Sequence, residues 1–129
     1  MKYLFSGEST AAMRLKKLHA VFFRSTENFI KNSVKNHTGG KVKRCVDLAC
    51  GTGYTTGTLA SVIDLSECVG LDNSPYFIER AREFLKNYDG VRFELQDITK
   101  IPFPVSDNDL IYARFILTHL ENPIGCIKK

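Results

Sequence analysis

No apolar run in this 129-residue chain approaches the roughly 18 residues that a membrane-spanning helix needs. Residues 1–8 also lack the apolar core of a signal peptide. We therefore expect a cytoplasmic protein with no membrane partner. With 43% hydrophobic residues the chain can bury one core, and nothing in its composition suggests a second.

Cysteine and histidine are few, and they are not arranged as ligands. The four cysteines form no Cys-x-x-Cys pair and have no histidine at metal spacing: Cys45, Cys50, Cys68 and Cys126. We expect neither a disulfide framework nor a metal site. The net charge is only +4, and the basic cluster of Lys41, Lys43 and Arg44 is typical of a solvated surface. Nucleic acid is therefore not an expected partner.

The most informative stretch is residues 45–57, where a short apolar run meets three glycines. The run at 45–49 indicates a strand, Gly51 and Gly53 indicate a turn, and the helical apolar spacing that follows indicates a helix. Glycine lets a ligand approach main-chain N–H groups without meeting a Cβ. The pattern predicts a ligand-binding turn, within which Cys50 is either a nucleophile or incidental.

The glycine spacing bears on the kind of ligand. In a dinucleotide fingerprint the third glycine follows the second by three positions, whereas Gly57 follows Gly53 by four. Thr56 stands where close helix–strand packing favours glycine or alanine. Asp72, at the end of a second apolar run, follows Gly53 by 19 positions and can accept both hydroxyls of a ribose. A nicotinamide dinucleotide is thus one alternative, with an imperfect match.

Four spaced motifs resemble those of the class I S-adenosylmethionine-dependent methyltransferases. Residues 47–53 are similar to the family's acid-x-Gly-x-Gly-x-Gly motif, with Ala49 in place of the first glycine. Three further segments match in the same order: 70–74, 94–98 and 109–114. The resemblance covers about residues 43–120 and looks like the first half of that family's domain.

This resemblance implies an α/β fold, a Rossmann-like three-layer sandwich on a mainly parallel sheet. About four of the family's usual seven strands are present, so the fold is truncated. We expect residues 1–40 to form an N-terminal helical lid and residues 41–129 the S-adenosylmethionine-binding domain, incomplete at its C-terminus. The fourth strand would leave an apolar edge open to self-association, unless the natural chain continues beyond Lys129.

Apolar periodicity predicts where the elements lie. Helical spacing over residues 8–34 places several apolar side chains on one face: Ala11, Leu15, Leu18, Phe22 and Phe29. A break is expected at residues 24–26, where Ser25 or Thr26 can cap a second helix. Strands are predicted at residues 43–49, 67–72, 91–95 and 109–113. Further helices are predicted at residues 54–63, from the N-cap Ser74 and Pro75 to residues 89–90, and at 115–127, with a loop at 101–105.

The resemblance also implies contacts to the methionine and ribose parts of the cofactor. Main-chain groups of Ala49, Gly51 and Gly53 would contact the methionine part, with Asp47 near its ammonium group. Asp72 would hold the ribose hydroxyls, although it could instead cap the turn that follows it.

The remaining implied contacts concern the adenine, the carboxylate and the reacting methyl. Asn73 would border the adenine, Asp97 would accept from its amino group unless it is only solvated, and Ile98 would add main-chain and apolar contact. Arg114 and Phe115 would line the floor where the donor methyl meets the acceptor. In the lid, Tyr3, Phe5 and Met13 could face the pocket, and Arg14 could meet the cofactor's carboxylate.

The implied reaction is an in-line displacement that requires alignment more than a catalytic constellation. The catalytic residues are unknown, with Arg114 and His119 as candidates, although His119 could be structural; His19 and His37 show no partner signal, and Asp109 is expected to be solvated or in a turn. Residues 109–114 lack the Asn/Asp-Pro-Pro-aromatic run typical of DNA amino-methyltransferases. We expect a methyltransferase for a small-molecule acceptor, with a nicotinamide-dependent oxidoreductase or a non-catalytic cofactor-binding module as alternatives.

Overall fold

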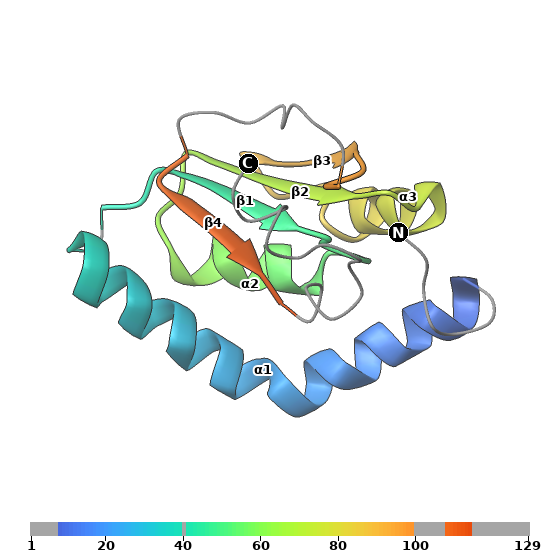
Figure 1. Ribbon diagram of the computed structural model, residues 1–129, viewed down its shortest axis with the longest axis horizontal. Helices are drawn as coiled ribbons and strands as arrows, with labels where there is room; N and C mark the ends of the chain where they lie inside the picture. Colours follow the sequence, from blue (N-terminus) through green and yellow to red (C-terminus); the bar gives the residue numbers. More distant parts are fainter. Residues whose placement is uncertain (1–7, 40, 100–107, 115–129) are drawn as a thin grey trace.

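The computed structural model describes residues 8–39, 41–99 and 108–114, and these form one sheet with helices (Figure 1). In chain order the elements are α1 (Glu8–Thr38), β1 (Arg44–Leu48), α2 (Tyr54–Val62), β2 (Glu67–Asp72), α3 (Pro75–Phe84), β3 (Val91–Leu95) and β4 (Leu110–Ala113). The predicted strands are confirmed to within about one residue at each end. The loop predicted at 101–105 and the helix predicted at 115–127 lie outside the described residues.

The strands are parallel and run in the order β3-β2-β1-β4. Because β1 pairs with β2 on one side and β4 on the other, Cys45 is aligned with both Cys68 and Leu110. Parallel neighbours need long crossover connections, which α2 and α3 supply between β1, β2 and β3. The α/β, Rossmann-like prediction is therefore confirmed.

The two faces of the sheet carry different sets of buried side chains. Cys45 and Cys68 lie on the face that α1 and α2 cover, in one cluster with Ile30 and Leu59. Their neighbours along the strands belong to a second cluster on the opposite face, Val46, Val69 and Leu71, and Ile98, which follows β3, packs with them. This alternation follows from the two-residue period of a strand. In Figure 1, α1 and α2 lie on the same side of the sheet.

α1 is one continuous helix, so the predicted break at residues 24–26 is wrong. Figure 1 shows that the helix bends near its middle instead. The segment contains neither proline nor glycine, and serine or threonine inside a helix does not force an end. Thr26 is buried, and its hydroxyl accepts a hydrogen bond from Arg114 Nη1 at 2.8 Å, so it contacts the end of β4 instead of capping a helix.

The buried face of α1 also differs from the prediction. Phe29 is 62% exposed and Phe22 is 39% exposed, whereas Ile30 and Val34 are buried. The sequence offers two apolar stripes here, and the one that includes Ile30 is the one that packs against α2 and the sheet. Of the predicted face, Ala11 is buried, while Leu15 and Leu18 are partly buried.

α3 begins as predicted and ends earlier. Ser74 is the N-cap, and its hydroxyl accepts from the Phe77 N–H at 3.2 Å, with Pro75 in the first turn. The helix ends at Phe84, not at residues 89–90, and turn residues lead to Gly90, whose φ is +77°. The apolar spacing continues through Leu85, which is why the sequence pattern extended the helix.

Candidate functional site

The glycine turn between β1 and α2 has the backbone geometry that its composition predicts. Three residues have positive φ: Ala49 at 55°, Gly51 at 59° and Gly53 at 94°. Ala49 is the only non-glycine residue with positive φ among the described residues, at the position where the resembling motif has a glycine. The turn therefore stores some backbone strain beside the end of β1.

Asp72 at the end of β2 is linked to this turn by hydrogen bonds. Its carboxylate accepts from the Gly51 N–H and from the Ser74 N–H, each at 3.0 Å, and the residue is 1% exposed. Asp72 thus holds the glycine turn and the start of α3 together. The turn-capping interpretation describes these contacts, and the ribose contact stays a prediction.

Asp47 lies beneath the turn, on the α2 side of β1. It is 1% exposed, and its carboxylate accepts from the Thr56 hydroxyl at 2.8 Å. Burial raises the pKa of Asp47 to about 7, against the opposing effects of the Thr56 hydrogen bond and of the Arg114 charge. In this arrangement Asp47 supports the turn from below, and contact with a ligand's ammonium group stays a prediction.

Thr56 is a residue whose role the sequence reasoning missed. Its place in the sequence shows only a departure from a glycine fingerprint, yet it is fully buried and its hydroxyl donates to Asp47. The available signal was the combination itself: a buried acid near the end of a strand needs a donor, and a hydroxyl in the first turn of the following helix can supply it.

Cys50 lies inside the turn, but its surroundings suppress its reactivity. The side chain is buried, and burial together with the neighbouring Asp47 and Asp72 charges holds the pKa of its thiol well above the usual range. A thiol that does not ionise is a poor nucleophile, so an incidental role fits better. Cys45, Cys50 and Cys68 are free thiols, and no cluster of metal-ligating side chains occurs among the described residues.

The residues after β3 that are predicted to contact the adenine have different surroundings. Asp97 accepts from the Thr99 N–H at 2.9 Å and also from its hydroxyl, which closes a small turn. The Ile98 side chain is 3% exposed and packs among Val46 and its neighbours on the sheet. Any contact of Ile98 with a ligand would therefore come from its main chain. Asn73, after β2, is partly buried.

Arg114 follows β4 and reaches α1, where it donates to Thr26. It lies close enough to Asp47 to affect the pKa of that residue. Arg14 is exposed on α1. Phe115, His119 and Cys126, like Tyr3 and Phe5, lie outside the described residues.

His19 has a partner that the sequence did not indicate. Its ring stacks on Tyr54 at 4.9 Å between centroids and meets Phe23 edge-on at 5.4 Å. Its Nδ1 is buried with no hydrogen-bond partner among the described residues. Burial and the Arg114 charge lower the pKa of His19, so the neutral form is favoured at this position.

α1 passes over the glycine turn. A Cβ added to Gly51 would lie 2.7 Å from Leu15 Cδ1, so Leu15 rests against a backbone that only glycine can present there. On the other side of the turn, a Cβ on Gly53 would meet Ala81 and Phe93 at 3.2 Å. The turn is thus enclosed between α1 and α3.

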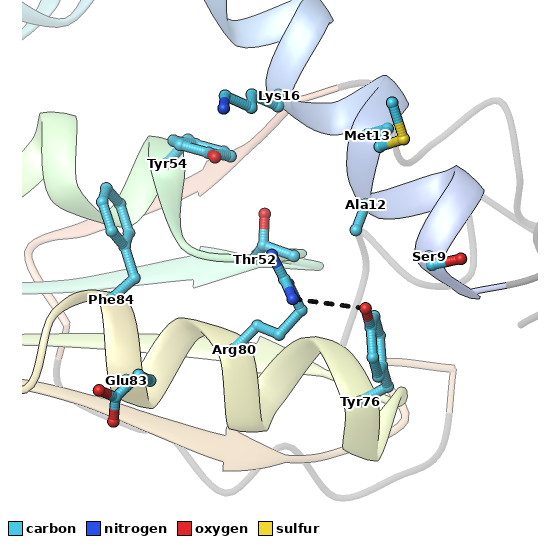
Figure 2. Close-up of a pocket in the computed structure, with 10 residues that line it drawn as sticks. All are labelled: Ser9, Ala12, Met13, Lys16, Thr52, Tyr54, Tyr76, Arg80, Glu83 and Phe84. Carbon is cyan, nitrogen blue, oxygen red and sulfur yellow. Dashed lines mark hydrogen bonds between the residues drawn. The ribbon is translucent and has the colours of Figure 1, made fainter.

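A cavity of about 480 Å³ lies between the start of α1 and α3, beside the turn (Figure 2). α1 contributes Ser9, Ala12, Met13 and Lys16. α3 contributes Tyr76, Arg80, Glu83 and Phe84. Thr52 and Tyr54 complete the lining from the turn and the start of α2. Met13 lines this cavity and Arg14 does not, and the approach of either residue to the cofactor pocket stays a prediction.

Comparison with known proteins assigns the family. The family described as "Methyltransferase domain" matches residues 46–129. The chain belongs to this family. Its resemblance to the class I methyltransferases, seen in the sequence motifs, is thereby confirmed.

Curated relatives are longer than this chain. An uncharacterized methyltransferase of Schizosaccharomyces pombe is 26% identical over 67% of the chain and 34% of its own length. A trans-aconitate 2-methyltransferase of Variovorax paradoxus is 42% identical over 57% of the chain and 27% of its own length. The methyltransferase chain thus spans about a quarter to a third of these relatives.

Solved structures share the fold. A putative S-adenosyl-L-methionine-dependent methyltransferase from Methanococcus maripaludis matches 99% of the chain and 60% of its own, with a TM-score of 0.77 and 21% identity. The plantazolicin methyltransferase BpumL in complex with SAH matches 94% of the chain and 45% of its own length, with a TM-score of 0.74 and 21% identity. At these identities the likeness establishes the methyltransferase fold alone.

Proposed function

We propose that this chain is the cofactor-binding part of an S-adenosylmethionine-dependent methyltransferase that acts on a small-molecule acceptor. The observation that carries the proposal is the link between the positive-φ glycine turn after β1 and the buried Asp72 at the end of β2. In parallel α/β sheets, ligands bind beyond the carboxyl ends of the strands, and both features lie there.

The residues present fit this cofactor in their chemistry. Gly51 and Gly53 have positive φ and no Cβ, so the turn can bring main-chain groups close to a ligand. Asp72 ends β2 and Asp97 follows β3, and their carboxylates can accept from ribose hydroxyls and from an amino group. When bound, the cofactor supplies an electrophilic methyl group on a sulfonium.

The protein groups then act by binding and orientation. Asp72 would exchange backbone contacts for ribose hydroxyls or accept from both, and Ala49, Gly51 and Gly53 would present main-chain groups to the methionine part. Arg114 and Phe115 would border the place where the methyl group meets the acceptor, and Arg14 would approach the cofactor's carboxylate. Because no proton has to move at the donor, a catalytic base is needed only if the acceptor carries a proton, which keeps His119 a candidate.

The small-molecule acceptor is supported by what similar proteins are named for. Relatives include trans-aconitate 2-methyltransferases and a malonyl-[acyl-carrier protein] O-methyltransferase. The first of these acts on a small acid. We propose the same broad class for this chain, in a cytoplasmic setting. The helices of the described part are all too short or too polar to cross a membrane.

Self-association through β4 is a further part of the proposal. Within the described residues β4 pairs only with β1, and Ile111 on it is 60% exposed. A second copy of the chain would cover this edge. Sedimentation of the chain at increasing concentration distinguishes a monomer from a self-associating species.

Calorimetric titration with S-adenosylhomocysteine tests the proposed cofactor, and NAD is the parallel ligand. We expect binding of S-adenosylhomocysteine alone. Asp72→Ala should weaken it by roughly ten-fold or more, because a charge-assisted hydrogen bond to the ligand is lost. Asp64→Ala, at an exposed carboxylate that follows α2, is the matched control and should leave the affinity unchanged. Binding of NAD alone would replace the methyltransferase proposal with the oxidoreductase alternative.

A further inference from the structure

We propose that the cavity between α1 and α3 is a binding site for a small planar carboxylate. The cavity has about 480 Å³, within the range of small-molecule sites. It adjoins the glycine turn through Thr52 but is built mainly from side chains of α1 and α3. None of the cofactor contacts proposed above uses these side chains.

The first argument is the charge of the lining. Lys16 reaches the cavity from α1 and Arg80 from α3, and Figure 2 shows them on opposite sides. The carboxylate in the lining, Glu83, is paired with Lys86 at 2.7 Å. Because Lys86 already pairs with Glu83, the described part of the lining presents Lys16 and Arg80 to a ligand, and a carboxylate is the group that complements them.

The second argument is a hydroxyl without a partner. Thr52 is 6% exposed, and its Oγ1 is buried with no hydrogen-bond partner among the described residues. Figure 2 shows Thr52 between α1 and α3, with its hydroxyl directed into the cavity. A buried hydroxyl without a partner is uncommon, and an oxygen of a bound carboxylate would satisfy it.

The third argument is the aromatic wall. Tyr54 is held between His19, with ring centroids 4.9 Å apart, and Phe84 at 5.1 Å. On the other side Tyr76 lies under the Arg80 guanidinium at 5.5 Å, and its hydroxyl accepts from Arg80 Nη1 at 3.4 Å. Rings that are fixed by their neighbours give the cavity flat walls, which favour a flat ligand. Arg80 is thereby also oriented before any ligand binds.

Binding of 2-naphthoate to the full chain tests this site. The neutral 2-naphthamide has the same ring system, and because the chain has no tryptophan the naphthyl fluorescence can be measured directly after equilibrium dialysis. We expect 2-naphthoate to bind at least about ten-fold more tightly than 2-naphthamide, since only the acid meets the two cations. Equal affinity of the two compounds would overturn the proposal.

Variants assign the binding to the cavity. Lys16→Met should weaken 2-naphthoate binding by about five-fold, whereas Lys17→Met, at the exposed neighbouring lysine, should leave it unchanged. Equal losses in both variants would show a diffuse charge effect and contradict the site. Thr52→Val should weaken binding to a similar extent, and Thr52→Ser, which keeps the hydroxyl, should retain it. Unchanged binding in a folded Thr52→Val chain would also contradict it.

The result is independent of the cofactor proposal. A chain that binds S-adenosylhomocysteine and not 2-naphthoate would leave the proposed function standing and remove this site. A chain that binds 2-naphthoate and not S-adenosylhomocysteine would support this site and contradict the proposed function.

Discussion

The hydroxyl of Thr56 donates to the carboxylate of Asp47 across 2.8 Å, and both residues are buried beneath the glycine turn. This contact joins α2 to the end of β1. Because burial raises the pKa of Asp47 to about 7, the turn rests on a carboxyl group that titrates near neutral pH. The turn's support is therefore sensitive to pH.

Asp47 should make the chain less stable as the pH rises. Its pKa is about 7 in the folded chain and 3.8, the ordinary value, in the unfolded chain, so the folded state holds the proton more tightly. The stabilisation is full at low pH and is lost as the pH rises through this window, by up to about 1.4 kcal/mol per pH unit. Asp47→Asn should remove this loss, as measured by urea unfolding from pH 5 to 8.

The matched control for this prediction is Asp64→Asn. Asp64 is fully exposed, so its substitution should keep the wild-type pH dependence. A chain with Asp47→Asn that loses stability with pH as steeply as the wild type would contradict the assignment.

Gly70 should tolerate no side chain. A Cβ there would lie 2.6 Å from Phe93 Cδ1 and 3.0 Å from Cys50 Cβ, and both neighbours are buried. We expect Gly70→Ala to lower the free energy of unfolding by about 1–3 kcal/mol, because a packed core does not absorb such an overlap. Chemical denaturation measures the loss, and Phe93→Leu in the same chain should restore part of it.

Gly57→Ala is the corresponding control. A Cβ at Gly57 would make ordinary contact with Leu85 at 3.4 Å inside α2. Alanine favours a helix over glycine by about 1 kcal/mol, so this variant should be as stable as the wild type or more stable. Equal losses at both glycines would mean that the Phe93 contact is not what excludes a side chain.

Adjacent residues of α1 should respond very differently to truncation. Ile30 is 2% exposed, so Ile30→Ala should lower stability by about 2–5 kcal/mol. Phe29 is 62% exposed, so Phe29→Ala should change it by about 0.5 kcal/mol or less. Thermal or urea unfolding of the two variants compares them directly. A larger stability loss for Phe29→Ala than for Ile30→Ala would instead support the buried helix face that the sequence pattern predicted.

The strands and the turn could be predicted because their signals are local. The ends of a strand can be predicted nearly to the residue when turn residues bound a short apolar run. β2 is an example, since Ser74 and Pro75 follow shortly after its last residue. The motifs around Asp47 and Asp72 indicated the family for the same reason, since each is contiguous in the chain.

The missed features depend on contacts between distant segments. α1 carries two apolar stripes, and only packing against α2 and β4 decides that Ile30 is buried and Phe29 is not. The stacking of His19 on Tyr54 likewise joins two helices whose register no local pattern encodes. Asp72 was placed correctly at the end of β2, but its bond to the Gly51 N–H appears only when the two strands lie side by side.

The parallel order β3-β2-β1-β4 has a consequence for how the chain assembles. Arg44 and Glu67, aligned on β1 and β2, are 23 residues apart, whereas Arg44 and Asp109, which meet where β4 begins, are 65 residues apart. Closing the longer loop loses more chain entropy, so β4 should dock last during folding. Its amides should therefore exchange with solvent sooner than those of β2.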